Sequence, residues 1–194
     1  MSDRARYRVL VADPPWAFGD KLTMSKVRRG AEANYGTLTT EDLLSRVAEE
    51  VFPVMATDSV CALWCPMALL GDGLNVLRAW KYVQKQALVW VKTAKGKAGL
   101  AFGMGHHFRG CAELVLFGVR GKVAPKVRNE RNVFLSPALP HSRKPEDLQD
   151  ALERMYPGPR LELFARRERD EWTCLGNECP TTPGEDICES LRSL

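Results

Sequence analysis

The chain has 194 residues, of which 45% are hydrophobic and 27% charged, a composition typical of a globular protein with one core of ordinary size. Its formal net charge of +4 is compatible with a polyanionic partner but does not require one. Because the sequence contains no apolar run of the length that a signal peptide or a membrane span needs, we expect a cytoplasmic protein without a membrane partner.

The first predicted element is a buried strand over residues 7–12 (YRVLVA), which is largely apolar and β-branched. It ends in the tetrapeptide DPPW at residues 13–16, where the prolines stop strand pairing because they have no N–H to donate. A polar, basic loop covers residues 17–38, and a capping box that begins at Thr39 predicts a helix to about residue 51. The sequence therefore places a carboxylate and a stiff turn at the end of the first strand.

The middle of the chain continues this alternation. Residues 59–65 (SVCALWC) predict a second buried strand, and Pro66 is well placed to begin a helix that reaches residue 80. Residues 83–91 predict a third strand, a glycine-rich basic loop covers residues 92–110, and residues 111–119 predict a fourth strand.

In the last third of the chain, a second basic loop covers residues 120–131 and precedes a short predicted strand at 132–136. Residues 141–156 have an amphipathic pattern typical of a helix, and residues 160–165 (RLELFA) predict another strand. A tail that contains glycine and proline begins at about Gly176.

Strands that alternate with helices predict an α/β fold, in which a mostly parallel sheet carries helices on both faces. Ligands of such sheets bind beyond the carboxyl ends of the strands, where Asp13, the loop after Val91 and Arg166 are expected. We find no internal repeat and no interdomain linker, so the basic loops interrupt one domain rather than joining two.

The DPPW turn has the groups that activation of an aromatic amine requires. Such an amine is a poor nucleophile because its lone pair is delocalised, and it pyramidalises more readily when acceptors hold its hydrogens. The Asp13 carboxylate and the Pro14 carbonyl are candidate acceptors, fixed in advance by the prolines. Trp16 offers a face for stacking, worth about 1–3 kcal/mol per base. In the alternative interpretation, the tetrapeptide is a simple turn and Trp16 is a core anchor.

Other cofactor motifs are weak in this sequence. The GxG pairs at residues 71–73 and 103–105 do not follow a strand as a dinucleotide fingerprint requires, and no phosphate-binding loop is present. The six cysteines lack the usual CxxC spacing of a zinc site, and we interpret them as reduced thiols that lie partly in the core: Cys61, Cys65, Cys111, Cys174, Cys179 and Cys188.

Eight segments together give a more specific signal: VLVADPPW (9–16), NYGTLTTEDL (34–43), CALWC (61–65), LVWVKT (88–93), GHHFRGCAELVLFGVRG (105–121), HSRKPEDL (141–148), RLELFARR (160–167) and WTCLGNE (172–178). In this order they resemble the MT-A70 family of DPPW-type, S-adenosylmethionine-dependent N6-adenine methyltransferases, including its compact bacterial and phage members. The resemblance implies a Rossmann-like class I methyltransferase fold in circularly permuted order, with the catalytic turn before the donor-binding half. It implies one domain over residues 1–178, followed by a tail over 179–194.

The resemblance also implies roles for individual residues. The catalytic set is Asp13, Pro14, Pro15 and Trp16. The substrate-binding set is Tyr35, His107 and Arg109. The set that binds S-adenosylmethionine is Asp13, Lys144, Glu162, Leu163, Phe164, Arg166, Asn177 and Glu178.

Several of these residues have a plainer alternative. Lys144 lies at a predicted helix N-terminus, where a cation needs a nearby anion such as the donor carboxylate, but it is otherwise a solvated lysine. Glu162 points away from the face of its leucine neighbours, toward a ribose diol or toward solvent. Phe164 is alternatively a core residue, and Glu113 either orients the preceding loop or faces outward. His106, His107 and Cys111 admit a metal site, but methyl transfer from a sulfonium needs no metal, and we expect none.

We therefore expect methyl transfer from S-adenosylmethionine to the N6 amine of adenine in DNA, because an unadorned chain resembles bacterial or viral members. The alternatives are RNA as substrate, a catalytically silent nucleic-acid-binding subunit, and an amine on a protein or small molecule. A homodimer or a second methyltransferase subunit is a further candidate partner. The best-known members have an acidic donor contact upstream of the DPPW strand, and we expect another residue to replace it here or the donor affinity to be modest.

Overall fold

The computed structural model describes residues 6–17, 38–96, 98–103, 107–139 and 143–194. Within these residues the strands form one sheet in the order β5-β3-β4-β2-β1-β6-β7. The strands are β1 (Tyr7–Ala12), β2 (Met55–Cys65), β3 (Val83–Thr93), β4 (Ala112–Arg120), β5 (Val133–Pro137), β6 (Arg160–Leu163) and β7 (Trp172–Leu175). The helices are α2 (Thr40–Leu44), α3 (Arg46–Val54), α4 (Leu70–Ala79), α5 (Asp147–Met155) and α6 (Ile187–Arg192), with a 3-10 turn η1 (Met67–Leu69).

The sheet is mostly parallel, as predicted. β1 is parallel to both of its neighbours, β2 and β6, and the pairs β6–β7 and β3–β5 are parallel as well. β4 is antiparallel to β2 and to β3, so it begins at the edge of the sheet where those two strands end. This edge therefore collects the ends of six strands and the start of one.

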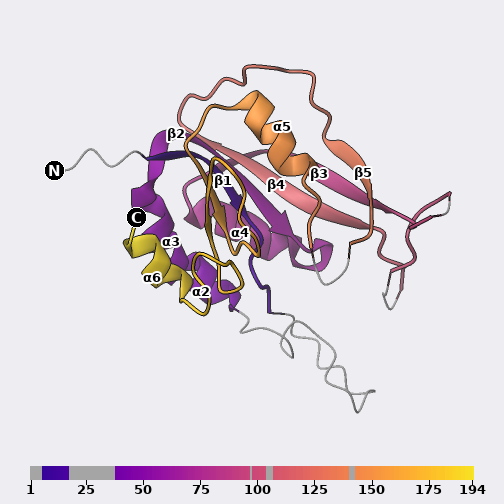
Figure 1. Cartoon of the computed structure of the whole chain (residues 1–194), viewed down its shortest axis with the longest axis horizontal. Helices are drawn as coiled ribbons and strands as arrows, with labels where there is room; N and C mark the ends of the chain where they lie inside the picture. Colours follow the sequence, from indigo (N-terminus) through magenta and orange to yellow (C-terminus); the bar gives the residue numbers. More distant parts are fainter. Residues whose placement is uncertain (1–5, 18–37, 97, 104–106, 140–142) are drawn as a thin grey trace, which may run out of the picture.

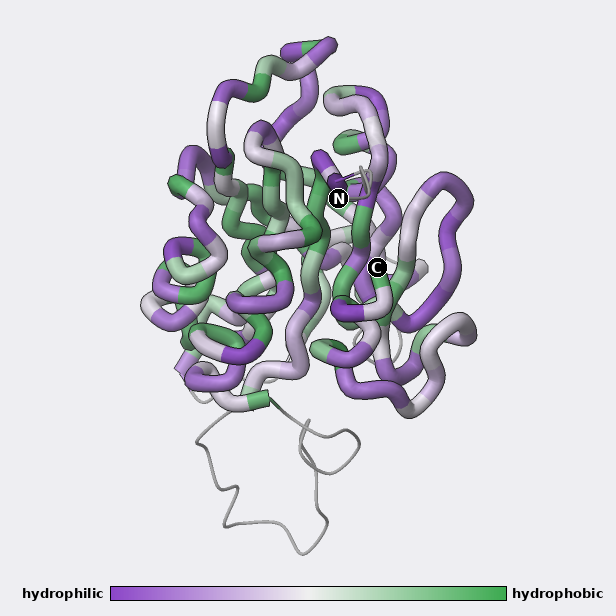
Figure 2. Tube along the Cα trace, turned by 90° about the vertical axis from the view of Figure 1, so that its left-hand side faces the viewer, coloured by the Kyte–Doolittle hydropathy of each residue, from purple (hydrophilic) through white to green (hydrophobic). Residues whose placement is uncertain are grey.

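Helices cover both faces of the sheet, which confirms the predicted α/β class (Figure 1). α2, α3, α4 and α6 pack on one face, where their apolar side chains meet Leu10 and Ala12 of β1. α5 packs on the other face, where Leu148 and Leu152 meet Val9 and Val11. Figure 2 shows the hydrophobic residues running through the middle of the molecule. Because β1 is buried on both faces from Val9 to Ala12, this part of the strand is continuously apolar rather than alternating.

The predicted elements differ from the structure mainly in their bounds. The capping box is confirmed, with Thr39 as N-cap and Asp42 returning the hydrogen bond, but the helix is divided into α2 and α3 at Ser45. Strand β7 and helix α6 were not predicted. α6 lies within the expected tail, yet Ile187, Cys188 and Leu191 are buried against the core because α6 packs on α3.

None of the helices in the described part of the chain has the length and apolar composition needed to cross a membrane.

Candidate functional site

Backbone hydrogen bonds hold the turn after β1. The Trp16 N–H donates to the Pro14 carbonyl at 2.8 Å, and the Leu38 N–H donates to the Pro15 carbonyl at 3.1 Å. Both carbonyls thus have one partner, and each keeps one lone pair for a further hydrogen-bond donor. The carboxylate of Asp13 is the charged acceptor that this turn holds at the sheet edge.

Trp16 is a core anchor rather than an open stacking face. Its side chain is 4% exposed, and its indole N–H donates to the carbonyl of Trp64 at 3.0 Å. This corrects the expectation that Trp16 offers its ring to a substrate base. Instead, the indole fixes the turn to the end of β2, which positions Asp13 indirectly.

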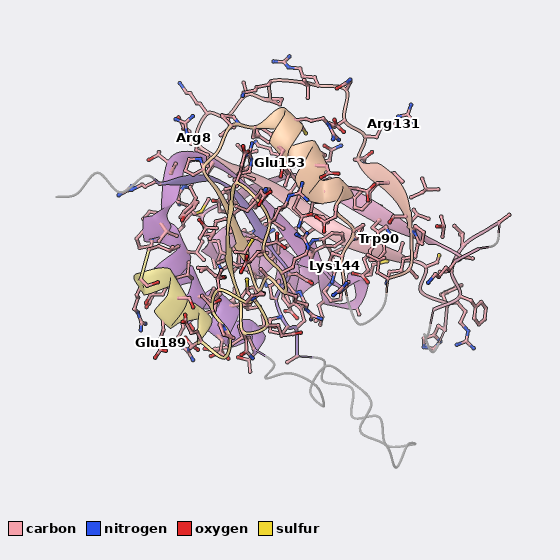
Figure 3. The ribbon with its side chains drawn as sticks, viewed as in Figure 1. Arg8, Trp90, Arg131, Lys144, Glu153 and Glu189 are labelled. Carbon is pink, nitrogen blue, oxygen red and sulfur yellow. The ribbon has the colours of Figure 1, made fainter. Side chains whose placement is uncertain are left out.

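Asp13 belongs to a chain of alternating charges. The ammonium of Lys144 lies 2.8 Å from Asp13 Oδ2 and 3.5 Å from Glu113 Oε2, and Glu113 also pairs with Lys92. Figure 3 shows Lys144 near the centre of the molecule, below α5. The anion that the sequence required near Lys144 is therefore supplied by the protein itself, since both carboxylates face the lysine.

The sheet topology explains why these four charges meet. Asp13 follows β1 and Lys92 lies near the end of β3, while Glu113 lies near the start of the antiparallel strand β4. Lys144 reaches the same edge from the segment before α5. Residues far apart in the sequence thus converge at one edge of the sheet.

The charges change the proton affinities of this cluster. Burial opposes ionisation of Lys144, but the negative charges of Asp13 and Glu113 outweigh it and raise the pKa of Lys144. Burial likewise opposes ionisation of Glu113, but Lys144 and Lys92 outweigh it and lower the pKa of Glu113. Both groups are therefore charged at neutral pH.

Aromatic side chains form the floor beneath Lys144. Its ammonium lies 5.4 Å from the ring centroid of Trp64, and Trp64 meets Trp90 and Phe134 edge to face, with centroids 6.1 and 6.2 Å apart. Trp90 is 1% exposed and donates to the carbonyl of Ser136. Trp64 thus lines the site, whereas Trp90 supports it from the core.

A cavity of about 230 Å³ opens between this cluster and the N-terminal end of α5. The following residues line it: Asp13, Trp64, Leu139, Arg143, Lys144, Pro145, Glu146, Gln149, Glu162, Phe164, Arg166 and Arg167. Five of the lining residues are among those predicted to bind the methyl donor: Asp13, Lys144, Glu162, Phe164 and Arg166. The structure brings these five together.

Glu162 faces the cavity, as its alternation in β6 predicted. Gln149 of α5 donates an amide hydrogen to Glu162 Oε2 at 3.2 Å. Burial raises the pKa of Glu162, and Arg167 and Gln149 offset this effect only in part. Gln149 is 1% exposed, and its Oε1 has no hydrogen-bond partner among the described residues.

A smaller hollow of about 50 Å³ adjoins the cavity on the other side of Phe164 and Arg166. It is lined by Asp13, Pro15, Phe164, Ala165, Arg166, Asn177 and Glu178. Both hollows share Asp13, Phe164 and Arg166, so they are neighbours at the same edge of the sheet. The exposed residues Asn177 and Glu178 thus border the site, as the family resemblance implied.

The chain turns sharply between the two hollows. Phe164 has a φ of +62°, a left-handed conformation that is uncommon for a bulky residue and is found at constrained sites. Gly176 permits the close approach of the two segments, because a Cβ there would lie 2.3 Å from the carbonyl oxygen of Ala165. Arg166 closes this side with an ion pair to Glu178 at 3.6 Å.

Other predicted residues lie apart from the cavity. The side chain of Leu163 is fully buried in the core, and its carbonyl accepts from the Asp13 N–H, so it supports the turn without lining the cavity. His107 and Arg109 are exposed on the segment between β3 and β4, which projects beyond the sheet (Figure 1). There Arg109 lies 4.9 Å from the ring centroid of Phe102. Tyr35 lies outside the described residues.

The sequence did not indicate Lys92 and Gln149 as residues of the site. The signal for Lys92 was its place near the end of a strand of the parallel set, equivalent to that of Asp13. The signal for Gln149 was its position on α5 next to the buried Leu148, where a polar side chain needs a partner.

Among the described residues, no group of three or more His, Cys, Asp or Glu side chains could hold a metal ion. Cys61, Cys65, Cys174, Cys179 and Cys188 are buried free thiols. Burial raises the pKa of Cys65 and Cys174 to about 11, so these thiols are unreactive at neutral pH.

Comparisons with known proteins identify the family of the chain. The MT-A70 family model matches residues 7–178. The chain is 30% identical over 180 residues to "N(6)-adenosine-methyltransferase catalytic subunit METTL3" of Homo sapiens, an alignment that covers 89% of this chain and 28% of that protein. It is 28% identical over 176 residues to "N(6)-adenosine-methyltransferase MT-A70-like" of Arabidopsis thaliana, covering 89% of this chain and 24% of the relative.

A shorter relative aligns over most of its own length. It is the "Type II methyltransferase M.MunI" of Mycoplasma sp, 28% identical over 195 residues, with 91% of this chain and 79% of that protein covered. By contrast, the chain spans about a quarter of the length of the first curated relatives that it matches.

Proposed function

Because the chain belongs to the MT-A70 family, we propose that it transfers the methyl group of S-adenosylmethionine to the N6 amino group of adenine in DNA. The observation that carries the proposal is the position of Asp13. Its carboxylate follows the hydrogen-bonded turn after β1 and lines both of the hollows that we assign to the methyl donor. No reacting group other than an acceptor for the amine hydrogens is required, because the donor brings its own leaving group.

The residues present fit S-adenosylmethionine. The cavity offers the cations Arg143 and Lys144 for the carboxylate of its amino-acid part, and the second hollow offers Asn177 and Glu178 for its nucleoside part. Gln149 supports this fit, because it lines the cavity and its buried Oε1 lacks a partner among the described residues. When bound, S-adenosylmethionine supplies an electrophilic methyl group on a positively charged sulfur.

Asp13 then has the central role in the reaction. One of its oxygens, Oδ2, is held by Lys144, so the carboxylate keeps a fixed orientation while the other oxygen accepts a hydrogen of the adenine amine. The Pro14 carbonyl has one lone pair left and provides a second acceptor. Held by two acceptors, the amine would pyramidalise and direct its lone pair at the methyl carbon, so that the N–C bond would form as the C–S bond breaks. The neutral thioether would leave, and the extra proton on the methylated amine would pass to the Asp13 carboxylate or to water.

Nucleic acid is the substrate class that the surroundings favour. Phe102 and Phe108 are 80% and 90% exposed on the projecting segment between β3 and β4, and Arg109 lies beside Phe102. Exposed aromatic rings next to a cation are suited to bases and phosphates. We propose DNA first because the relative whose length the alignment nearly spans is named a type II methyltransferase. RNA adenosine is the second candidate, because the longer relatives are named adenosine methyltransferases.

The test is methyl transfer from isotope-labelled S-adenosylmethionine to duplex DNA, single-stranded DNA and RNA in parallel, followed by mass spectrometry of the nucleosides. We expect N6-methyladenine nucleoside from DNA with the wild-type chain. Asp13→Asn preserves the shape of the side chain but removes its charge. We expect this variant to give about a hundredfold less product or lower, the effect of losing one transition-state contact. The RNA product alone would correct the substrate. Label in no pool, despite donor binding, would contradict catalysis by the isolated chain and indicate a silent subunit or a required second subunit.

A further inference from the structure

The buried amide oxygen of Gln149 is a polar atom that the protein alone does not satisfy. Gln149 is 1% exposed, and its amide nitrogen is used by Glu162. Its amide oxygen is buried and has no partner among the described residues, and Gln149 is one of the residues that line the cavity. A buried hydrogen-bond acceptor without a partner is costly and uncommon in folded proteins. A ligand that supplies an N–H or O–H group to this oxygen therefore gains affinity.

The other hydrogen-bond acceptors near this oxygen favour a ligand group that is both a cation and a hydrogen-bond donor. Glu162 lies beside Gln149, and Asp13 lines the same cavity. Lys144 is engaged by Asp13 and Glu113, so it does not supply the missing donor to Gln149 in any contact that the structure shows. Arg166 and Arg167 line the same cavity, but Arg167 offsets the effect of burial on Glu162 only in part, so acceptors remain for a further cation. An ammonium, with three hydrogens, matches them better than a neutral hydroxyl.

The opposite charges occupy the mouth of the same cavity. Arg143 and Lys144 immediately precede α5, at the end of the cavity wall that Gln149 and Glu162 continue. A pocket of about 230 Å³ with cations beside a set of acceptors is complementary to a small zwitterion. The α-amino acid group of the donor is such a zwitterion.

We propose that Gln149 Oε1, together with the carboxylate of Glu162, binds the α-ammonium group of the methionine part of S-adenosylmethionine. This assignment rests on the proposed function and adds a recognition residue that the sequence did not indicate. The raised pKa of Glu162 agrees with it, because a carboxyl group buried without a full counter-charge gains from a cationic ligand. The ribose of the donor is correspondingly assigned to the neighbouring hollow rather than to Glu162.

The test compares three ligands by isothermal titration calorimetry: S-adenosylhomocysteine, its analogue without the α-amino group, and 5′-methylthioadenosine, which keeps the ribose but lacks the amino-acid part. The proteins are the wild type, Gln149→Leu and the matched control Gln86→Leu, in which an exposed glutamine of β3 is replaced. We expect the wild type to prefer S-adenosylhomocysteine over the deamino analogue by about tenfold or more, the value of one charge-assisted hydrogen bond. Gln149→Leu should lose this preference and leave 5′-methylthioadenosine binding unchanged, and Gln86→Leu should change nothing.

Each other outcome overturns the assignment. An equal loss of affinity for all three ligands in Gln149→Leu would show that Gln149 shapes the cavity or contacts the ribose. Equal wild-type affinity for S-adenosylhomocysteine and its deamino analogue would overturn the assignment without any variant, which covers the case that Gln149→Leu does not fold. Absence of S-adenosylhomocysteine binding to the wild type would overturn the proposed function as well, so the two failures are distinguishable.

Discussion

Replacing Lys144 by methionine removes the positive charge between Asp13 and Glu113 while keeping a side chain of similar length. The side chains of Lys144, Asp13 and Glu113 are 15%, 22% and 30% exposed, so the cluster is largely withdrawn from water. Removing one partner of a fully buried ion pair costs about 3–5 kcal/mol. Because water still screens this cluster in part, we expect Lys144→Met to lower the free energy of unfolding by about 1–2 kcal/mol.

The assay is thermal unfolding of the wild type and Lys144→Met as a function of pH. For a chain of this size the expected loss corresponds to a melting temperature lower by roughly 2–8 °C at neutral pH. The folded-state pKa of Glu113 lies below its ordinary value of 4.5, so its ionisation stabilises the fold above that value, and this contribution is lost as the pH falls through the lowered pKa. The difference in melting temperature between the wild type and Lys144→Met should therefore become smaller in acid.

A control variant separates charge from packing. Lys126→Met removes an exposed lysine and should leave the melting temperature unchanged. If the melting temperature of Lys144→Met stayed below that of the wild type by a constant amount into strong acid, the electrostatic reasoning would be refuted. Such a loss would come from packing, which does not depend on pH. By calorimetry, Lys144→Met should also weaken S-adenosylhomocysteine binding about 10- to 100-fold through loss of one charge-assisted contact, and unchanged affinity would remove Lys144 from the donor site.

Two further predictions concern the supports of the site. Trp16→Phe leaves the buried carbonyl of Trp64 without its donor and should lower the free energy of unfolding by about 1–3 kcal/mol in urea titrations; an unchanged midpoint would show that this bond does not hold the turn. Gly176→Ala places a Cβ against the backbone of Ala165 and should abolish S-adenosylhomocysteine binding and destabilise the fold by at least about 2 kcal/mol. The control Gly71→Ala, in open space on a helix, should be neutral or slightly stabilising, and similar behaviour of the two alanine variants would contradict the close-approach argument.

Local sequence determined most of the secondary structure and the position of the reacting turn. The short apolar run before Asp13 specified β1, because it is rich in β-branched valine, is too short for a helix and ends at two prolines. The prolines ended it, and the Thr39 capping box fixed the start of α2. These features depend on neighbours a few residues away, so they can be read from a single sequence. Short elements such as β7 and α6 were not predicted, since they are stabilised by the strands and helices on which they pack.

The tertiary structure decided which side chains meet at the turn. Asp13 and Lys144 are 131 positions apart, and only the sheet order places β1 beside β6 and brings the start of β4 to the edge where β2 and β3 end. The same packing turned the indole of Trp16 into the core and placed Gln149, with its unpartnered oxygen, beside the cavity. Propensity and spacing carry no information about such contacts, because they arise from the burial of two sheet faces at once. The sequence by itself thus determined the acceptor, and the fold determined its partners.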